Sequence, residues 1–216
     1  MDKPDRETLI LERILSLKQM IREGRAQPTD YHELGVCFFH LKNYDQAAES
    51  LSELTKLYPD YLEIASVHAL RVFCLLQEAR YEEAGKILKE RLKLYPEDIR
   101  LLSMFAHIKE KQNLFMEAVD LHRRILKIAP DHVNSLNSVG YLLTLYGKPE
   151  DMGEASNCLK RVLQLKPDYP AYLDSFGVFL GKRGQKENAR KALMKALRKA
   201  PENAEILQHL KEVLHI

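Results

Sequence analysis

Histidine and cysteine side chains lie close together in one stretch of the chain, at His32, Cys37 and His40. Imidazole and thiolate groups are common ligands of zinc, so these residue types would suit a metal site. The stretch has helical periodicity, and successive residues of a helix are about 100° apart around its axis. Cys37 is therefore about 140° from His32 and lies off the histidine face. The spacing predicts that no metal is bound here.

Motifs of catalysis and cofactor binding are missing from the rest of the sequence. It contains no glycine-rich phosphate loop, no GxSxG and no HExxH. We therefore expect no catalytic residue, no cofactor and no enzymatic activity. The three cysteines, Cys37, Cys74 and Cys158, form no CxxC pair and are odd in number. This usage is typical of a reducing compartment, and we expect a cytoplasmic protein.

Composition and charge restrict the class of protein further. The 216 residues are 45% hydrophobic and 30% charged, which is enough apolar material for a core and argues against disorder. Thirty-three Lys and Arg residues oppose 31 Asp and Glu residues, so the net charge of +2 gives no overall argument for nucleic acid. No apolar run reaches about 18 residues, and the first residues are charged. We expect neither a membrane-spanning helix nor a secretory signal.

A basic segment covers residues 182–199, with eight cationic residues and one acid, Glu187. Such a surface could attract an acidic partner, a phosphate backbone or lipid headgroups. The alternative is a solvated outer helix, whose cations are favoured near its carboxyl end by the helix dipole. We favour the second interpretation because no aromatic residues alternate with the charges.

Five prolines divide the chain at a regular interval. A proline ends a helix because it has no N–H and clashes with the preceding turn. Each of the five is followed by an acid, which can cap the next helix. The spacings are 37, 34, 37 and 34 residues and predict stacked helical hairpins. The prolines are Pro59, Pro96, Pro130, Pro167 and Pro201, and the acids are Asp60, Glu97, Asp131, Asp168 and Glu202.

The residues before each proline show a second regularity. The first unit contains Tyr31-x2-Leu34-Gly35-x2-Phe38, followed by Tyr44, Ala47 and Leu51. This resembles the tetratricopeptide repeat (TPR), whose pattern is W-x2-L-G-x2-Y, then A-x3-F, then P. The second unit is weaker, because Val72 replaces the small residue. The later units match with Phe105, Ala106 and Ala118 in the third, Val139, Gly140 and Ala155 in the fourth, and Phe176, Gly177 and Ala189 in the fifth.

The resemblance implies an all-α fold, a right-handed α-solenoid of about five TPR helix-turn-helix repeats with N- and C-terminal capping helices. Small residues such as Gly35, Gly140 and Gly177 would let the two helices of a pair approach closely, which justifies their cost within a helix. The expected units are residues 28–60, 61–97, 98–131, 132–168 and 169–202. Residues 1–27 and 203–216 are expected to cap the two ends.

The resemblance also implies a binding groove, because in TPR proteins the first helices of successive pairs line a concave surface. Phe73 and Tyr141 are unexpectedly large and apolar for surface positions, while Asn134 and Asn137 could pair with an extended backbone. Alternatively, a neighbouring terminal helix covers some of the aromatics and makes them core. The expected groove residues are His32, Val36, Phe39, Phe73, Leu76, Arg100, His107, Asn134, Asn137, Tyr141, Asp174 and Val178.

The resulting hypothesis is a non-catalytic protein–protein interaction adaptor or scaffold. It would hold an extended or helical segment of a partner in the concave groove. The alternative is a structural subunit of a larger assembly, or an assembly chaperone, that uses its convex or end surfaces. TPR proteins that clamp a chaperone C-terminal carboxylate use Lys, Asn and Arg at groove positions. Here those positions hold residues such as His32, Val36 and Phe73, so we expect no such clamp, and no nucleic acid partner.

Overall fold

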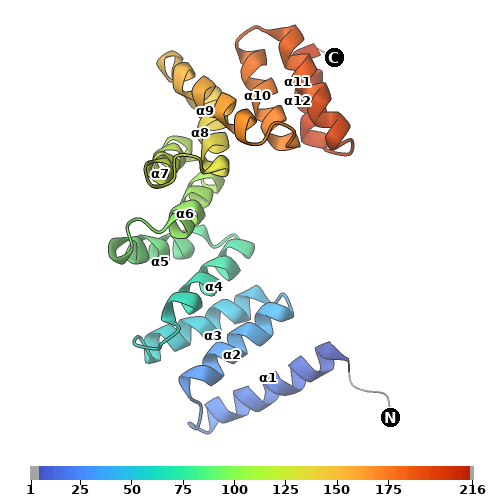
Figure 1. Ribbon diagram of the computed structural model, residues 1–216. Helices are drawn as coiled ribbons and strands as arrows, with labels where there is room; N and C mark the ends of the chain where they lie inside the picture. Colours follow the sequence, from blue (N-terminus) through green and yellow to red (C-terminus); the bar gives the residue numbers. More distant parts are fainter. Residues whose placement is uncertain (1–4, 215–216) are drawn as a thin grey trace. The chain divides into compact units, whose positions relative to one another are not determined.

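The computed structural model describes residues 5–214, and most of them are helical (Figure 1). Within this range there are twelve α-helices and one 3-10 turn, and no strand. The chain divides into two compact units, and the boundary in the sequence falls between Leu94 and Tyr95. The helices of unit 1 are α1 (Arg6–Arg22), α2 (Pro28–His40), α3 (Tyr44–Leu57), α4 (Ile64–Gln77) and α5 (Tyr81–Leu94). Those of unit 2 are α6 (Ile99–Lys111), α7 (Phe115–Ile128), α8 (Val133–Tyr146), η1 (Pro149–Asp151), α9 (Met152–Leu165), α10 (Pro170–Lys182), α11 (Lys186–Lys199) and α12 (Ala204–Leu214).

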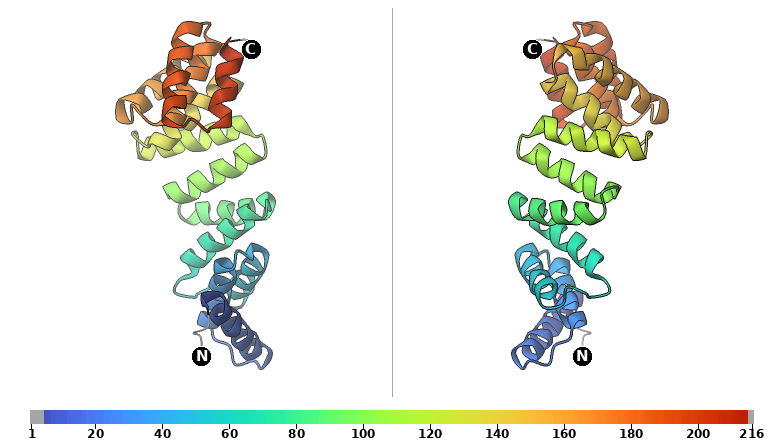
Figure 2. Two further views of the ribbon diagram at one scale, coloured as in Figure 1. Left: turned by 90° about the vertical axis from the view of Figure 1, so that its right-hand side faces the viewer. Right: turned by 90° about the vertical axis from the view of Figure 1, so that its left-hand side faces the viewer.

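In unit 1, α1 packs against α2, and each later helix packs antiparallel against the one before it (Figure 2). The apolar faces of α2, α3 and α4 meet in a core that contains Tyr31, Leu51, Leu54 and Val67. Burial of this area from water is the main contribution to the stability of the stack. Unit 1 therefore has the hairpin architecture expected from the sequence.

Unit 2 repeats the arrangement with three helical pairs, and α12 packs against both α10 and α11. Its larger core lies among α7, α8, α9 and α10 and includes Val139, Leu143 and Leu159. A second core joins α12 to the last pair through Leu193, Ile206 and other apolar residues. The expected all-α fold of stacked helical pairs is confirmed.

Glycines inside the first helices mark where paired helices touch. An ideal Cβ at Gly35 would lie 2.6 Å from Leu51 Cδ2, and one at Gly177 would lie 2.6 Å from Leu193 Cγ. Gly140 has the same relation to Leu159 Cγ, at 2.5 Å. No Cβ can be accommodated at these distances without movement of the neighbouring leucine. The close approach predicted from the repeats is thus present in the first, fourth and fifth pairs.

The acids that follow the prolines have a different role from the one expected. The side chain that caps α6 is Asp98, and the one that caps α12 is Asn203, each one residue after the acid. Asp131 instead pairs with Arg161 of α9 at 2.8 Å, and Asp168 pairs with Lys195 of α11 at 2.8 Å. These cations hold the pKa of Asp131 and of Asp168 below its usual range. Asp131 and Asp168 therefore connect one repeat to the next through solvent-exposed ion pairs.

Four of the five pairs turn between their helices through a residue with positive φ. These residues are Lys42, Ala79, Asn113 and Gly184, with φ between 54° and 74°. The fourth pair lacks this turn and instead contains a longer loop, in which η1 precedes α9. The left-handed conformation is unfavourable for a residue with a Cβ, so three of these turns carry a local strain that Gly184 avoids.

Helices are present in both segments that were expected to form caps. Asp5 accepts a hydrogen bond from the Thr8 amide and starts α1, and Gly24, with φ 67°, follows its end. Residues 1–4 and 215–216, which belong to the expected capping segments, lie outside the described residues. In the described part of the chain, no helix is long and apolar enough to cross a membrane.

Candidate binding surfaces

Aromatic side chains gather on one surface of unit 1, where α2 and α4 lie beside the start of α3. The ring centroid of Phe73 is 5.6 Å from that of Phe39 and 6.1 Å from that of Tyr44, both in edge-to-face geometry. Phe39 and Tyr44 are themselves 6.0 Å apart. Phe73 has 38% of its area exposed, although its ring is packed on one side. We call this the α2–α4 surface; it consists of Val36, Phe39, Tyr44, Phe73 and Leu76.

Helical spacing and one tight turn place these residues together. Val36 and Phe39 are three residues apart on α2, and Phe73 and Leu76 have the same spacing on α4, so each pair shares a helix face. Tyr44 begins α3 directly after the turn and is thereby brought back beside Phe39. Tyr44 is not among the groove residues expected from the sequence, although it belongs to the repeat pattern of the first unit.

His32 lies nearer the start of α2 and contacts the loop that precedes α4. Its Nδ1 is 3.3 Å from the Tyr61 hydroxyl and 3.7 Å from a carboxylate oxygen of Glu63. The two rings meet edge to face, with their centroids 5.8 Å apart. Burial raises the pKa of the Tyr61 hydroxyl. His32 is therefore half-buried by residues of its own unit.

Two expected groove residues lie on α6, in unit 2. Arg100 and His107 are both exposed, while Ser103 between them is half-buried. The Arg100 guanidinium is 3.3 Å from the Asp98 carboxylate that caps the same helix. These residues carry polar groups on a solvated face and show no apolar cluster like that of the α2–α4 surface.

The expected residues on α8 are engaged with other parts of unit 2. The Tyr172 hydroxyl donates a hydrogen bond of 2.8 Å to Asn134 Oδ1. Asn137 Oδ1 is buried and has no hydrogen-bond partner among the described residues. Tyr141 is half-buried, and burial raises its pKa to about 12. This face is thus more enclosed than its counterpart on α2 and α4.

Helix α12 covers the expected groove residues of α10. Asp174 is 6% exposed and Val178 is 9% exposed, so the expectation that both are open to a partner is wrong for this arrangement. His209 of α12 explains the burial, because its Nδ1 lies 2.9 Å and 3.0 Å from the two carboxylate oxygens of Asp174. Its ring also lies 6.4 Å from that of Tyr141. The terminal helix α12 thus covers two expected groove residues that are not aromatic and lies beside one expected aromatic, Tyr141.

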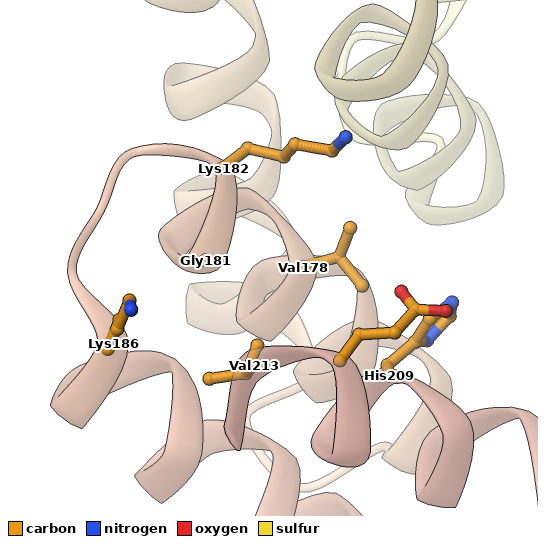
Figure 3. A pocket seen from close by; sticks show the side chains of 7 residues that line it. Val178, Gly181, Lys182, Lys186, His209 and Val213 are labelled. Atoms are coloured by element: carbon orange, nitrogen blue, oxygen red, sulfur yellow. The ribbon is translucent and has the colours of Figure 1, made fainter. Parts of the chain in front are cut away.

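A hollow of about 290 Å³ persists beside α12 (Figure 3). Val178 and Lys182 of α10 and His209 and Val213 of α12 surround it. Hydrogen bonding to Asp174 raises the pKa of His209, while its burial acts in the opposite direction. A carboxylate thus favours the protonated form of the imidazole that holds α12 in place.

Groups that suggest catalysis or metal binding are buried or scattered. No cluster of three or more His, Cys, Asp or Glu side chains suited to a metal occurs among residues 5–214. His122 connects Glu110, at 3.1 Å, with the Ser135 hydroxyl, at 3.0 Å, which is the order of groups in a hydrolase triad. Ser135 is 0% exposed, however, so its hydroxyl cannot reach a substrate. This chain of bonds joins α6, α7 and α8.

The three cysteines are free and buried. Burial raises the pKa of the Cys74 and Cys158 thiols to about 11 and also raises that of Cys37. A thiol with such a pKa is almost entirely protonated near neutrality and is a poor nucleophile and metal ligand. Within the described residues, the side chains most suited to function are therefore those of the exposed surfaces.

Comparison with known proteins agrees with the repeat pattern. A family model of the tetratricopeptide repeat matches residues 28–61. The fold is similar to the crystal structure of a tetratricopeptide repeat protein from Parabacteroides merdae, with a TM-score of 0.71 and 13% identity over 95% of this chain and 72% of that one. The chain belongs to the tetratricopeptide repeat family. TPR proteins are typically non-catalytic, and their fold generally mediates protein–protein interactions.

Two further comparisons concern a solved TPR structure and a curated relative. YrrB, described as a TPR protein with an unusual peptide-binding site, has a TM-score of 0.68 and 17% identity over 90% of this chain and 97% of its own. The uncharacterized protein ycf37 of Guillardia theta is 30% identical over 122 residues, which are 56% of this chain and 68% of the relative. That match places both chains in one family.

Proposed function

We propose that this TPR protein is a non-catalytic adaptor that binds an apolar segment of another protein on the α2–α4 surface. The observation that carries the proposal is Phe73, whose ring is packed by Phe39 and Tyr44 on one side and 38% exposed on the other. A ring held in this way loses little side-chain freedom when a partner covers it, because its orientation is already fixed. Aromatic anchors of this kind commonly dominate the energy of an interface.

The surface favours an extended or helical segment with at least one large apolar side chain. Val36 and Leu76 are half-buried neighbours that would extend the apolar contact along both helices. The α2 and α4 positions that would hold a carboxylate in a clamp carry His32, Val36 and Phe73, which supports a partner other than a chaperone C-terminus. The buried thiols suit a reducing, cytoplasmic setting.

Peptides selected from a random display library against the whole chain would test this proposal. Phe73→Ala should reduce the affinity for the selected peptides about thirtyfold, since truncation of an aromatic anchor commonly costs about 2 kcal/mol of binding free energy. Leu57→Ala provides a matched control, because Leu57 is also exposed and in unit 1 but lies outside the α2–α4 surface. Equal affinities of wild type and Phe73→Ala for every selected peptide would contradict the proposal.

The same comparison addresses the alternative, a structural subunit that binds through its convex or end surfaces. In that case, incorporation into the assembly should be unaffected by Phe73→Ala. Circular dichroism melts must accompany the binding data, because loss of the contacts with Phe39 and Tyr44 will reduce stability to some extent. A Phe73→Leu variant keeps apolar volume, and we expect it to restore part of the affinity.

A further inference from the structure

A second hollow, of about 740 Å³, lies in unit 2 between α9 and α11, with α10 forming its floor. The three helices are labelled in Figure 1. It is separate from the hollow beside α12, with which it shares no lining residue. We call it the α9–α11 groove; it is lined by Pro149, Met152, Gly153, Ser156, Lys160, Phe176, Phe179, Leu180, Arg183, Gln185, Asn188 and Ala192.

Each helix contributes one row of residues to the groove at helical spacing. On α10 the row runs from Phe176 through Leu180 to Arg183, so apolar side chains lead up to a cation at the end of the helix. The rows of α9 and α11 include Gly153 and Ala192, whose small side chains leave the space between the helices unfilled. Phe179 and Leu180 are buried and Phe176 is half-buried, so the floor is apolar.

The rim of the groove is positively charged. Lys160 and Arg183 line it and are exposed, and no acidic residue belongs to its lining. Elsewhere on α11, Arg190 pairs with Glu187 and Lys195 pairs with Asp168, both at 2.8 Å. The side chains of Lys160 and Arg183, by contrast, have no ion pair among residues 5–214. Two available cations above an apolar floor are complementary to carboxylates that flank an apolar group.

We propose that the α9–α11 groove binds an acidic peptide segment of another protein that carries one large apolar side chain. The apolar side chain lies over Phe176 and Leu180, and flanking Asp or Glu carboxylates reach Lys160 and Arg183. The amide groups of Gln185 and Asn188 and the Ser156 hydroxyl are suited to pair with the peptide backbone. This site differs from the α2–α4 surface in its helices, its charge and its partner.

A peptide fits these observations better than a nucleic acid. Base stacking needs an aromatic ring with an open face. The rings of Phe176 and Phe179 are instead nearly parallel, with an interplanar angle of 19° and centroids 6.2 Å apart, and Phe179 is buried. The apolar floor suits an aliphatic or aromatic side chain of a bound peptide.

Fluorescence polarisation with a labelled synthetic peptide tests the proposal. The probe carries a single Leu or Phe between runs of Asp and Glu, and its counterparts replace the apolar residue by Ser or the acids by Lys. We expect the acidic apolar probe to bind, the Ser form to bind at least tenfold more weakly, and the Lys form not to bind. Added salt should weaken the binding, since exposed charges are screened. Absence of binding by the acidic apolar probe overturns the proposal.

Substitutions locate the binding on the whole chain. Lys160→Glu combined with Arg183→Glu should reduce affinity at least tenfold. Lys191→Glu combined with Lys199→Glu changes the net charge equally at exposed residues outside the groove and should have a smaller effect. If the two pairs weaken binding equally, the probe recognises only general charge, and the proposed site is wrong.

Gly153→Leu separates occupation of the groove from folding. An ideal Cβ at Gly153 would meet nothing within 4 Å apart from its own helix, so a leucine can enter the groove without strain. Leucine also has a higher helix propensity than glycine, and we expect an unchanged or higher Tm. The Gly153→Leu variant should no longer bind the acidic probe, whereas Phe73→Ala should bind it as the wild type does. Full binding by Gly153→Leu, or displacement of the probe by a single-stranded oligonucleotide as efficiently as by unlabelled peptide, would overturn the proposal.

Discussion

The face formed by α2 and α4 and the face formed by α8 and α10 are built from the same repeat positions but differ in exposure. In unit 1, Phe73 projects from a packed aromatic cluster and is 38% exposed. In unit 2, Val178 is buried and Tyr141 is half-buried, and His209 of α12 reaches Asp174 and lies beside Tyr141. The difference shows that a repeat position determines where a side chain is placed, whereas the neighbouring element determines whether a partner can reach it.

The largest expected effect on stability comes from substitutions at the positions where the two helices of a repeat touch, one in each unit. Gly35→Leu and Gly177→Leu place a side chain where an ideal Cβ already lies 2.6 Å from a buried leucine. Overpacking of this kind typically costs about 1–3 kcal/mol of unfolding free energy. Urea unfolding, combined with amide hydrogen exchange, should show lost protection in α2–α5 for Gly35→Leu and in α8–α12 for Gly177→Leu.

Gly153→Leu is the control, because the added side chain has open space there. If Gly35→Leu lowered protection in both units equally, the two units would unfold as one cooperative body. They would then differ in the exposure of their surfaces but not in stability. Unchanged urea midpoints for both overpacked variants would contradict the assigned contacts.

A smaller effect on stability is expected from a change of pH, and its sign is opposite in the two units. The pKa of His209 is raised above its ordinary value of 6.5 by the hydrogen bond to Asp174. The contribution of His209 to the stability of the fold is therefore fully present below pH 6.5 and is lost as pH rises through the folded pKa. In unit 1, burial and the nearby Arg91 and Arg71 lower the pKa of His68 to about 4, so stability is lost as pH falls from 6.5 through 4.

NMR amide shifts recorded between about pH 4 and pH 9 can separate these two changes. We expect α12 to loosen on the alkaline side and α4 and α5 to loosen on the acidic side. Asp174→Asn keeps the shape of the side chain but removes the charge, and it should abolish the alkaline change in α12 while leaving the acidic change intact. An alkaline change that survives in Asp174→Asn would assign it to another group.

The smallest expected effect concerns the turns within the pairs. Ala79 in unit 1 has φ 54°, whereas Gly184 in unit 2 has φ 74° and nothing within 4 Å of an ideal Cβ. Ala79→Gly should stabilise unit 1, and Gly184→Ala should destabilise unit 2, each by about 1 kcal/mol, because only the backbone preference changes. Thermal melts of both variants test this symmetry, and shifts of the same sign in both would contradict it.

The fold was predictable because its evidence is repeated along the chain. Gly35, Gly140 and Gly177 occupy equivalent positions, and the structure brings each against a leucine of the paired helix. The role of the acids after the prolines was not predictable in the same way. Asp131 and Asp168 could cap a helix or pair with a distant cation, and the choice depends on where α9 and α11 present Arg161 and Lys195.

The surfaces were less predictable, because exposure depends on packing between elements far apart in the chain. Asp174 and Val178 have the expected position, but a single sequence does not say that His209, 35 residues after Asp174, returns to cover them. The α9–α11 groove was missed for a similar reason. The groove forms where small side chains of α9 and α11 lie near large side chains of α10, and no local sequence motif indicates that combination.

The short link between α11 and α12, residues 200–203, makes α12 a tethered competitor for the face it covers. A segment attached by so short a link has an effective concentration of about the millimolar range or higher. A free partner of Tyr141 and Val178 would have to outcompete that local concentration, whereas Phe73 is already 38% exposed. Equal intrinsic affinities for the two faces would thus give unequal occupancies, in favour of the face on unit 1.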